Sequence, residues 1–217
     1  MIPVIAFGLR RNGAGSRPSP LGLALFFASL CMLATGAFFT LDGVRIKAKA
    51  FTAQVLLDKA WRKTLAGEAA ARPWPWADTW PVLMLEAPRL RQKSIVLHGV
   101  SGQAMAFGPG LMTGGPAPGE PGLAVISAHR DTHFRFLQDV ALDDEILVTG
   151  ADGAVRAFRI TDLRIVEATR SGLSHDGDKS QLALVTCWPF DALRRGPLRF
   201  VAIADRVDGP PLNTAYG

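Results

Sequence analysis

Three side chains that could take part in a reaction each lie at one end of an apolar segment. Cys187 closes one such segment, His129 follows another, and Arg199 lies at the start of a third. Short aliphatic and β-branched runs bounded by proline or polar residues are typical of β-strands. A thiol, an imidazole and a guanidinium are the parts of a site in which a cysteine attacks a carbonyl group. The three segments are 123–127, 182–187 and 198–204.

Each of these residues also has an ordinary structural explanation when it is taken alone. A single cysteine in a strand is most often a small buried apolar residue, and an arginine that opens a strand usually lies at a solvated edge. The alternation of its strand puts Arg199 on the same side as Val201 and Ile203, where it can face a neighbouring Cys187. Arg195 is the alternative arginine, because it follows the cysteine more closely. The coincidence of three strand ends favours the functional interpretation.

The sequence around these residues resembles the histidine, cysteine and arginine motifs of sortases, in the order in which that family has them. The matching strings are Ser-Ala-His-Arg-Asp-Thr-His-Phe at 127–134, Leu-Val-Thr-Cys at 184–187 and Arg-Phe-Val-Ala at 199–202. The closest likeness is to the proteobacterial type, called class GN. Ala128 stands where that group usually has glycine, and the resemblance extends over roughly residues 78–206.

The resemblance implies a cysteine transpeptidase that needs no cofactor. Cys187 would be the nucleophile, His129 the general acid and base, and Arg199 the hydrogen-bond donor to the substrate or the oxyanion. The substrate would be a Leu-Pro-x-Thr-Gly-like sorting signal of a dedicated target protein, cut between Thr and Gly, and the acceptor an amine that the sequence does not identify. Three further candidates for substrate contact are Thr186, Asp131 and Trp188.

Other interpretations of the same residues stay open. A membrane-anchored β-barrel that binds peptide without catalysis would leave Cys187 unreactive, and a cysteine hydrolase would use water as its acceptor. His133 follows His129 at the spacing of a zinc motif, but Arg130 stands where such enzymes have glutamate. The preceding strand favours a loop rather than a helix here, so no metal site is expected. The role of His133 is open.

Composition excludes some classes of function. The chain has 217 residues, a net charge of +5 and a hydrophobic fraction of 48%. The basic residues are scattered and do not interleave with aromatic ones, so we do not expect a nucleic-acid partner. The two cysteines, Cys31 and Cys187, lie in an apolar segment and in the globular part, respectively. A disulfide between them is not expected, and a free thiol in an oxidising compartment suggests a reactive role.

An uncharged apolar segment near the start predicts a membrane helix. Residues 21–41 are long enough for a helix of about 30 Å, which matches the hydrocarbon core of a bilayer. A signal peptide would have a shorter apolar region and a small-x-small cleavage site. Arg45, Lys47 and Lys49 lie beyond the segment, so charge alone gives almost no orientation. The resemblance implies a single-pass anchor in the inner membrane, with the catalytic domain on the periplasmic side.

The segment after the apolar run predicts a second helix that starts at Asp42 as its cap. Prolines then exclude a helix around Trp74, Trp76 and Trp80. These tryptophans fit either an interfacial belt at the membrane or packing on the domain.

About eight short strands between turn signals predict a mainly β fold, with few and short helices. A small closed β-barrel agrees with the sortase resemblance, although spacing alone would also allow a sandwich. Residues 150–153 carry a hairpin signal, and the glycine-rich stretch 107–120 predicts a long loop. The expected organisation is a disordered cytoplasmic tail 1–20, a transmembrane anchor 21–41, a helical stalk and Pro/Trp-rich linker 42–77, a catalytic domain 78–208 and a flexible tail 209–217.

Overall fold

The computed structural model describes residues 19–192, 194 and 196–208. Most of the expected N-terminal tail, the expected C-terminal tail 209–217 and the alternative arginine, Arg195, lie outside these residues. Contacts divide the chain into two units, Met1–Ala48 and Lys49–Gly217.

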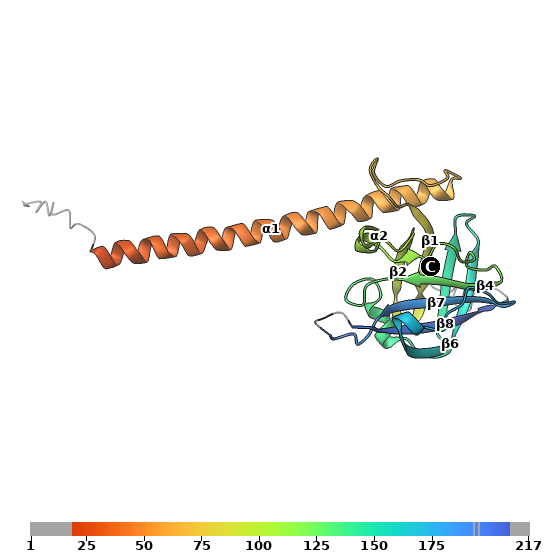
Figure 1. Cartoon of the computed structure of the whole chain (residues 1–217). Coiled ribbons are helices and arrows are strands. Elements are labelled where there is room, and N and C mark those ends of the chain that lie inside the picture. Colours follow the sequence, from red (N-terminus) through yellow and green to blue (C-terminus); the bar gives the residue numbers. More distant parts are fainter. Residues whose placement is uncertain (1–18, 193, 195, 209–217) are drawn as a thin grey trace, which may run out of the picture. The chain divides into compact units, whose positions relative to one another are not determined.

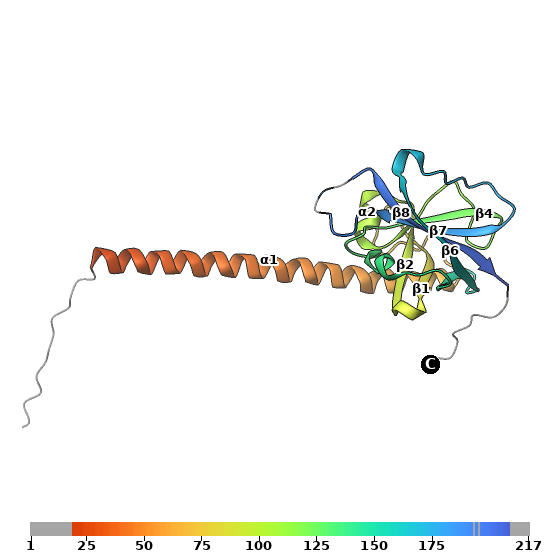
Figure 2. The ribbon, with the colours of Figure 1, turned by 90° about the horizontal axis from the view of Figure 1, so that it is seen from below.

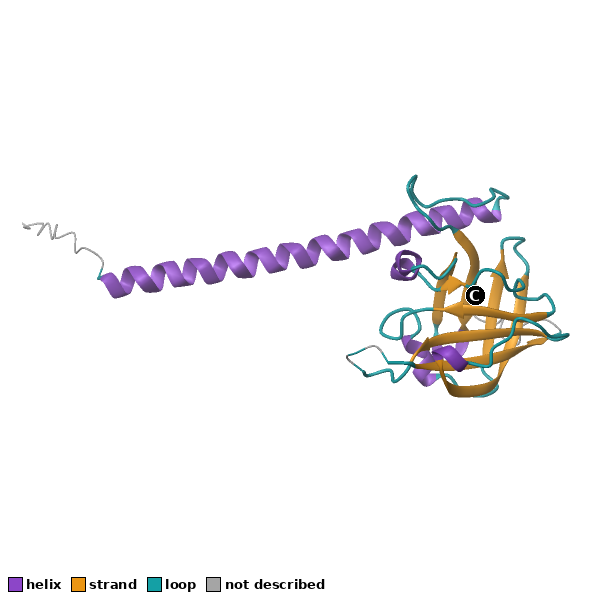
Figure 3. Ribbon diagram, viewed as in Figure 1, coloured by secondary structure: helices purple, strands orange, loops and turns teal. Residues whose placement is uncertain are grey.

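Eight strands form a closed barrel in the second unit, as the sequence predicts (Figures 1 and 3). Around the barrel the order is β1-β2-β3-β4-β7-β8-β6-β5, and β1 pairs with β5 to close it. The strands are β1 Pro81–Ala87, β2 Gln92–His98, β3 Gly110–Leu111, β4 Gly122–Ser127, β5 Glu145–Gly150, β6 Val155–Glu167, β7 Ser180–Cys187 and β8 Leu198–Val207. The helices are α1 Pro20–Leu65, α2 Gly102–Phe107 and the short 3-10 turns η1 Pro88–Leu90, η2 Arg135–Asp139 and η3 Ala168–Arg170.

Strands β4, β7 and β8 lie side by side and form the wall that carries the predicted site (Figure 2). β4 pairs with β7 in parallel, whereas β8 is antiparallel to both of its neighbours, β7 and β6. Strand β8 therefore lies between two strands that precede it in the sequence.

Alternation along these strands separates an inner from an outer apolar face. The inner face of this wall fills the barrel together with the side chains of the remaining strands. Its members on β4, β7 and β8 are Ala124, Ile126, Leu182, Leu184, Ala202 and Ala204. The outer face carries a second apolar cluster, made of Leu123, Val125, Ala183, Val201 and Ile203.

Helix α1 runs without a break from Pro20 to Leu65. The expected helix start at Asp42 is therefore wrong, because a solvent-exposed polar residue is tolerated within a continuing helix. The side chains of the described part of the first unit, 19–48, are exposed, and by length and composition α1 can cross a membrane. It is a candidate membrane span near the N-terminus.

The last turns of α1 pack on the outside of the barrel. Leu57 and Trp61 are 1% and 6% exposed and contact Met84, Ile95 and Leu97 of strands β1 and β2. Burying one such side chain stabilises a fold by about 1.5–3 kcal/mol. This end of α1 is thus part of the folded domain.

The tryptophans after α1 divide between the two interpretations of the sequence. Trp74 packs edge-on against Phe107, with ring centroids 4.9 Å apart, and Trp80 stacks on His98 at 4.1 Å. Trp76 is 78% exposed. Two of the three rings therefore serve domain packing.

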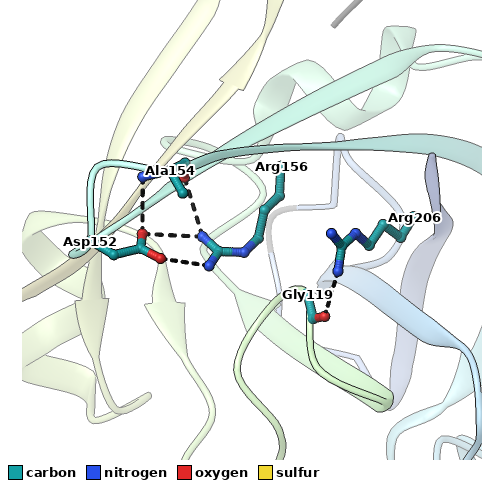
Figure 4. Close-up of polar contacts among 5 residues, drawn as sticks. All are labelled: Gly119, Asp152, Ala154, Arg156 and Arg206. Atoms are coloured by element: carbon teal, nitrogen blue, oxygen red, sulfur yellow. Dashed lines mark hydrogen bonds and ion pairs between the residues drawn. The ribbon is translucent and has the colours of Figure 1, made fainter. Parts of the chain in front are cut away.

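Arg206 binds the loop that leads into β4, and the side chain of Arg156 lies close to the same loop (Figure 4). Arg206 donates to the carbonyl oxygen of Gly119 at 2.8 Å, and a Cβ on Gly119 would lie 2.5 Å from the side chain of Arg156. Gly119 also has a φ of +105°, so only glycine fits here without strain. Arg156 in turn binds Asp152, with Nη2 2.6 Å from Oδ2.

Replacing Asp152 by asparagine is expected to reduce the loss of folding stability that occurs as the pH falls from about 4 to 2. The hydrogen bonds from Arg156, aided by the N–H of Ala154, lower the pKa of Asp152 to about 2. Its pKa in the unfolded chain is about 3.9, so the stabilisation is present above that pH and is lost as the pH falls towards 2. The effect should be small, because the Asp152 side chain is 52% exposed and solvent screens the pair.

The measurement is the midpoint of thermal unfolding between pH 6 and pH 2. Asp78→Asn, at an exposed position without an ion pair among the described residues, is the matched control. An equal loss of stability between pH 4 and 2 in wild type and in Asp152→Asn would contradict the assignment.

Candidate active site

Strands β7 and β8 bring the predicted thiol and guanidinium together. Cys187 is the last residue of β7 and lies directly opposite Arg199 in the antiparallel register. Directly opposed residues have Cβ atoms about 4.5–5.5 Å apart and project on the same face of a sheet. Both residues are half-buried.

The parallel pairing of β4 with β7 brings His129 to the same place. Ser127 is in register with Val185, and the N–H of Ala128 donates to the carbonyl oxygen of Val185 at 3.2 Å. Strand β4 ends at Ser127, and this hydrogen bond keeps Ala128, the residue before His129, at the Cys187 end of β7. All three predicted catalytic residues thus lie at one end of the β4-β7-β8 wall.

Thr186 links the cysteine strand to the histidine turn. Its hydroxyl donates to the carbonyl oxygen of Ala128 at 2.8 Å, and the residue is only 2% exposed. Since side chains alternate along a strand, Thr186 points to the inner face and Cys187 to the outer one. The structure therefore gives Thr186 a visible role in positioning, while its predicted contact with substrate stays a prediction.

The outer face next to Cys187 is apolar. Along β7 the residues on this side are Ala183 and Val185, and along β8 they are Val201 and Ile203. Leu173, from the segment between β6 and β7, packs on the same cluster. Met112 and Val166 also pack on it, so the loop 107–120 and the strand region after Asp162 both border this face.

The guanidinium of Arg199 is partly occupied by backbone groups. Its Nη1 donates to the carbonyl oxygens of Gly196 at 2.9 Å and Leu198 at 2.8 Å. These bonds fix one edge of the guanidinium to the loop between β7 and β8. Hydrogen bonds on one edge of a planar fork orient the remaining donors.

Aromatic side chains anchor the chain directly after the cysteine. The ring of Trp188 lies 5.5 Å from that of Phe190 and 6.1 Å from that of Phe200, measured between centroids. Phe190 and Phe200 also pack against the barrel core. The segment that leaves Cys187 is therefore held by apolar contacts at its start.

A cavity of about 580 Å³ opens between the histidine turn and the segment after Cys187. The predicted substrate-contact residues Asp131 and Trp188 both line it. Its other lining residues are Arg130, Arg135, Gln138, Pro189, Phe190 and Asp191.

His133 faces a different cavity from the one at Asp131. That cavity measures about 360 Å³, and the side chains of Asp58 and Lys93 also line it. Burial lowers the pKa of His133, and the neighbouring His129 lowers it further. Over the described ranges, no group of three or more His, Cys, Asp or Glu side chains lies close enough to share a metal ion.

A family model for the sortase domain matches residues 85–207, which is more than half of the chain. The chain belongs to the sortase family. The match includes His129, Cys187 and Arg199, and it ends with strand β8.

Known sortases share sequence and fold with this chain. Sortase D of Bacillus subtilis (strain 168) is 26% identical over 125 residues, which cover 57% of this chain and 63% of that protein. Sortase A from Corynebacterium diphtheriae superposes with a TM-score of 0.57 at 25% identity, over 64% of this chain and 66% of the other. A sortase D5 transpeptidase from Clostridium perfringens, at 17% identity, shares the fold with a TM-score of 0.54 over 69% and 88%. The chain spans less than two thirds of the first two relatives.

Sequence reasoning missed Arg130 as a member of the site. Its guanidinium Nη2 donates to the carbonyl oxygens of Ala192 and Arg194, in the loop between β7 and β8. Backbone acceptors leave no trace in a sequence, so no motif could have identified this contact. The one signal in the sequence is the position of Arg130 directly after His129.

Proposed function

We propose that this sortase is a membrane-anchored cysteine transpeptidase that cleaves a Leu-Pro-x-Thr-Gly-like sorting signal of a dedicated target protein. The observation that carries the proposal is the register that sets Cys187 opposite Arg199, at the end of β7 where β4 leads into His129. The motif strings that flank these residues support the narrower assignment to the proteobacterial class GN. The uncharged segment 20–41 of α1 supports a single-pass anchor, and the family resemblance supports its place in the inner membrane with the catalytic domain on the periplasmic side.

In the first half of the proposed reaction, the thiolate of Cys187 attacks the carbonyl carbon of the threonine in the signal. The resulting oxyanion accepts a hydrogen bond from Arg199, and the carbon–nitrogen bond then breaks. His129 gives its proton to the departing glycine amine. The product is a thioester between Cys187 and the target protein.

In the second half, an amine takes the place of the glycine. It attacks the thioester carbonyl and loses a proton to His129, and the thiolate of Cys187 leaves. The acceptor receives the acyl chain as a new amide, and the site returns to its starting protonation. Val185, which is half-buried on the outer face two positions before Cys187, offers an apolar contact to the leucine or proline of the signal.

The test is intact-protein mass spectrometry of the full chain in detergent micelles. The protein is mixed with a peptide that carries Leu-Pro-x-Thr-Gly, first without added amine and then with triglycine. A transpeptidase should gain the mass of the acyl fragment and then release it as an amide of triglycine.

Other outcomes would replace the proposal. An adduct that gives only the free acid in the presence of triglycine would indicate a cysteine hydrolase. A peptide that binds without any adduct or cleavage, across several variants of the signal, would indicate a binding module.

A further inference from the structure

We propose that Arg130 is a positioning residue that holds the β7–β8 loop, residues 188–197, against the turn that carries His129. Through this loop it also sets the place of Arg199. The part of the inference that concerns catalysis rests on the proposed transpeptidase function, whereas the part that concerns the loop does not.

Arg130 joins the histidine turn to the β7–β8 loop by hydrogen bonds. Arg130 lies directly after His129, and its Nη2 donates to the carbonyl oxygen of Arg194 at 3.0 Å and to that of Ala192. Charge-assisted hydrogen bonds of this kind are stronger than neutral ones. They join two segments that belong to different halves of the site, because one carries the imidazole and the other continues from Cys187.

Arg199 binds the same loop near its β8 end. Its Nη1 donates to the carbonyl oxygen of Gly196 at 2.9 Å. The loop tip thus lies between two guanidinium groups, one from the end of β4 and one from the start of β8. A displacement of the tip would move an acceptor of Arg199, and with it the orientation of that guanidinium next to Cys187.

The loop tip, residues 191–196, makes few other hydrogen bonds in its described part. Among its described residues 191, 192, 194 and 196, no further hydrogen bond reaches a residue outside the loop. Two backbone hydrogen bonds hold the ends of the loop separately. The N–H of Trp188 donates to the carbonyl oxygen of Leu198 at 3.0 Å, and the N–H of Ala168 donates to the carbonyl oxygen of Pro197 at 2.8 Å. Among the described residues of the tip, the hydrogen bonds to the rest of the domain are thus those from the two arginines.

The second terminal nitrogen of Arg130, Nη1, does not take part in these hydrogen bonds. This nitrogen is buried and has no hydrogen-bond partner within the described ranges. A buried donor without a partner costs free energy, so the contribution of Arg130 to the loop rests on the two hydrogen bonds from Nη2.

Arg130→Gln is therefore expected to loosen the loop and lower kcat more than it raises KM. A shift of the loop by about 1 Å would lower the rate on the order of 10- to 100-fold, because catalytic hydrogen bonds depend steeply on position. Arg130→Lys keeps the charge but lacks the planar fork, so it should recover only part of the rate. Arg91→Gln is the matched control, since Arg91 is exposed between β1 and β2, lines none of the cavities described above and has no side-chain hydrogen bond or ion pair among the described residues.

Two measurements on the full chain in detergent test the proposal. The first is hydrogen–deuterium exchange of peptides that cover 188–198, which should be at least several-fold faster in Arg130→Gln than in wild type and in Arg91→Gln. Unchanged exchange in Arg130→Gln would overturn the proposal. This readout needs no activity, so it stands even if the transpeptidase assignment fails. If Arg130→Gln does not fold, the same comparison is made with Arg130→Lys.

The second measurement is a double-mutant cycle on kcat, with Arg130→Gln, Arg199→Gln and the double variant. If Arg130 acts through the loop that Arg199 binds, the double variant should be slower than Arg199→Gln by clearly less than the effect of Arg130→Gln alone. A difference of about fivefold or more from the product of the single effects would support the coupling. Effects that simply multiply would show that the two arginines act independently.

Discussion

Replacing Cys187 by alanine is expected to abolish the acyl-enzyme adduct and to lower peptide turnover by roughly 10,000-fold or more. The methyl group that remains cannot attack a carbonyl, while the neighbouring strands keep their register because the contacts of β7 with β4 and β8 are made by the backbone. Peptide binding should therefore survive. The measurement is the intact mass of the protein after incubation with the signal peptide, together with the initial rate of cleavage.

Cys31→Ala provides the matched control for that experiment. Cys31 is exposed on the described first unit, and Cys187 is the other cysteine of the chain. Adduct formation at the wild-type rate in Cys31→Ala and none in Cys187→Ala assigns the thioester to the strand end. An adduct that persists in Cys187→Ala would remove Cys187 from the mechanism.

Replacing His129 by glutamine is expected to slow acylation by roughly 100- to 10,000-fold, the usual range for the loss of a general acid or base. Glutamine has a similar reach and can still form hydrogen bonds, but it cannot give a proton to the departing amine. The adduct should therefore still form, slowly, which distinguishes this variant from Cys187→Ala. Rapid-quench measurement of the adduct mass over time gives the rate.

His98→Gln is a suitable comparison for the histidine experiment. His98 ends β2 and stacks on Trp80, away from the β4-β7-β8 wall, so acylation should stay close to the wild-type rate. If His129→Gln acylates as fast as His98→Gln, the general acid must be sought elsewhere, and His133 would be the next histidine to test.

The sequence predicts the barrel well where one side of a strand faces the core. Apolar patterning locates β4, β7 and β8 to within a few residues, and residues 150–153 correctly indicate the β5–β6 hairpin. Strand β6 does not follow one alternating pattern over its whole length. Its register shifts between Ile160 and Asp162, and such a shift interrupts the alternation on which the prediction relies.

Other elements could not be predicted because they lack a local pattern. Helix α2 has only six residues and β3 has two, too few for a period to appear. Both fall at or near the glycine-rich stretch that predicted only a loop. The candidate site divides in the same way: Cys187 and His129 stand out by residue type, whereas the contact of Arg130 with two backbone oxygens could only be seen in three dimensions.

The place of β8 between β6 and β7 limits when the barrel can close during synthesis. Ribosomes synthesise the chain from its N-terminus, so the barrel cannot close until residues 198–207, which form β8, have left the exit tunnel. The same strand carries Arg199 to its position opposite the thiol. A nascent or truncated chain without β8 therefore has Cys187 but neither a closed barrel nor Arg199 opposite it, and the thiol acquires these surroundings only once β8 has paired.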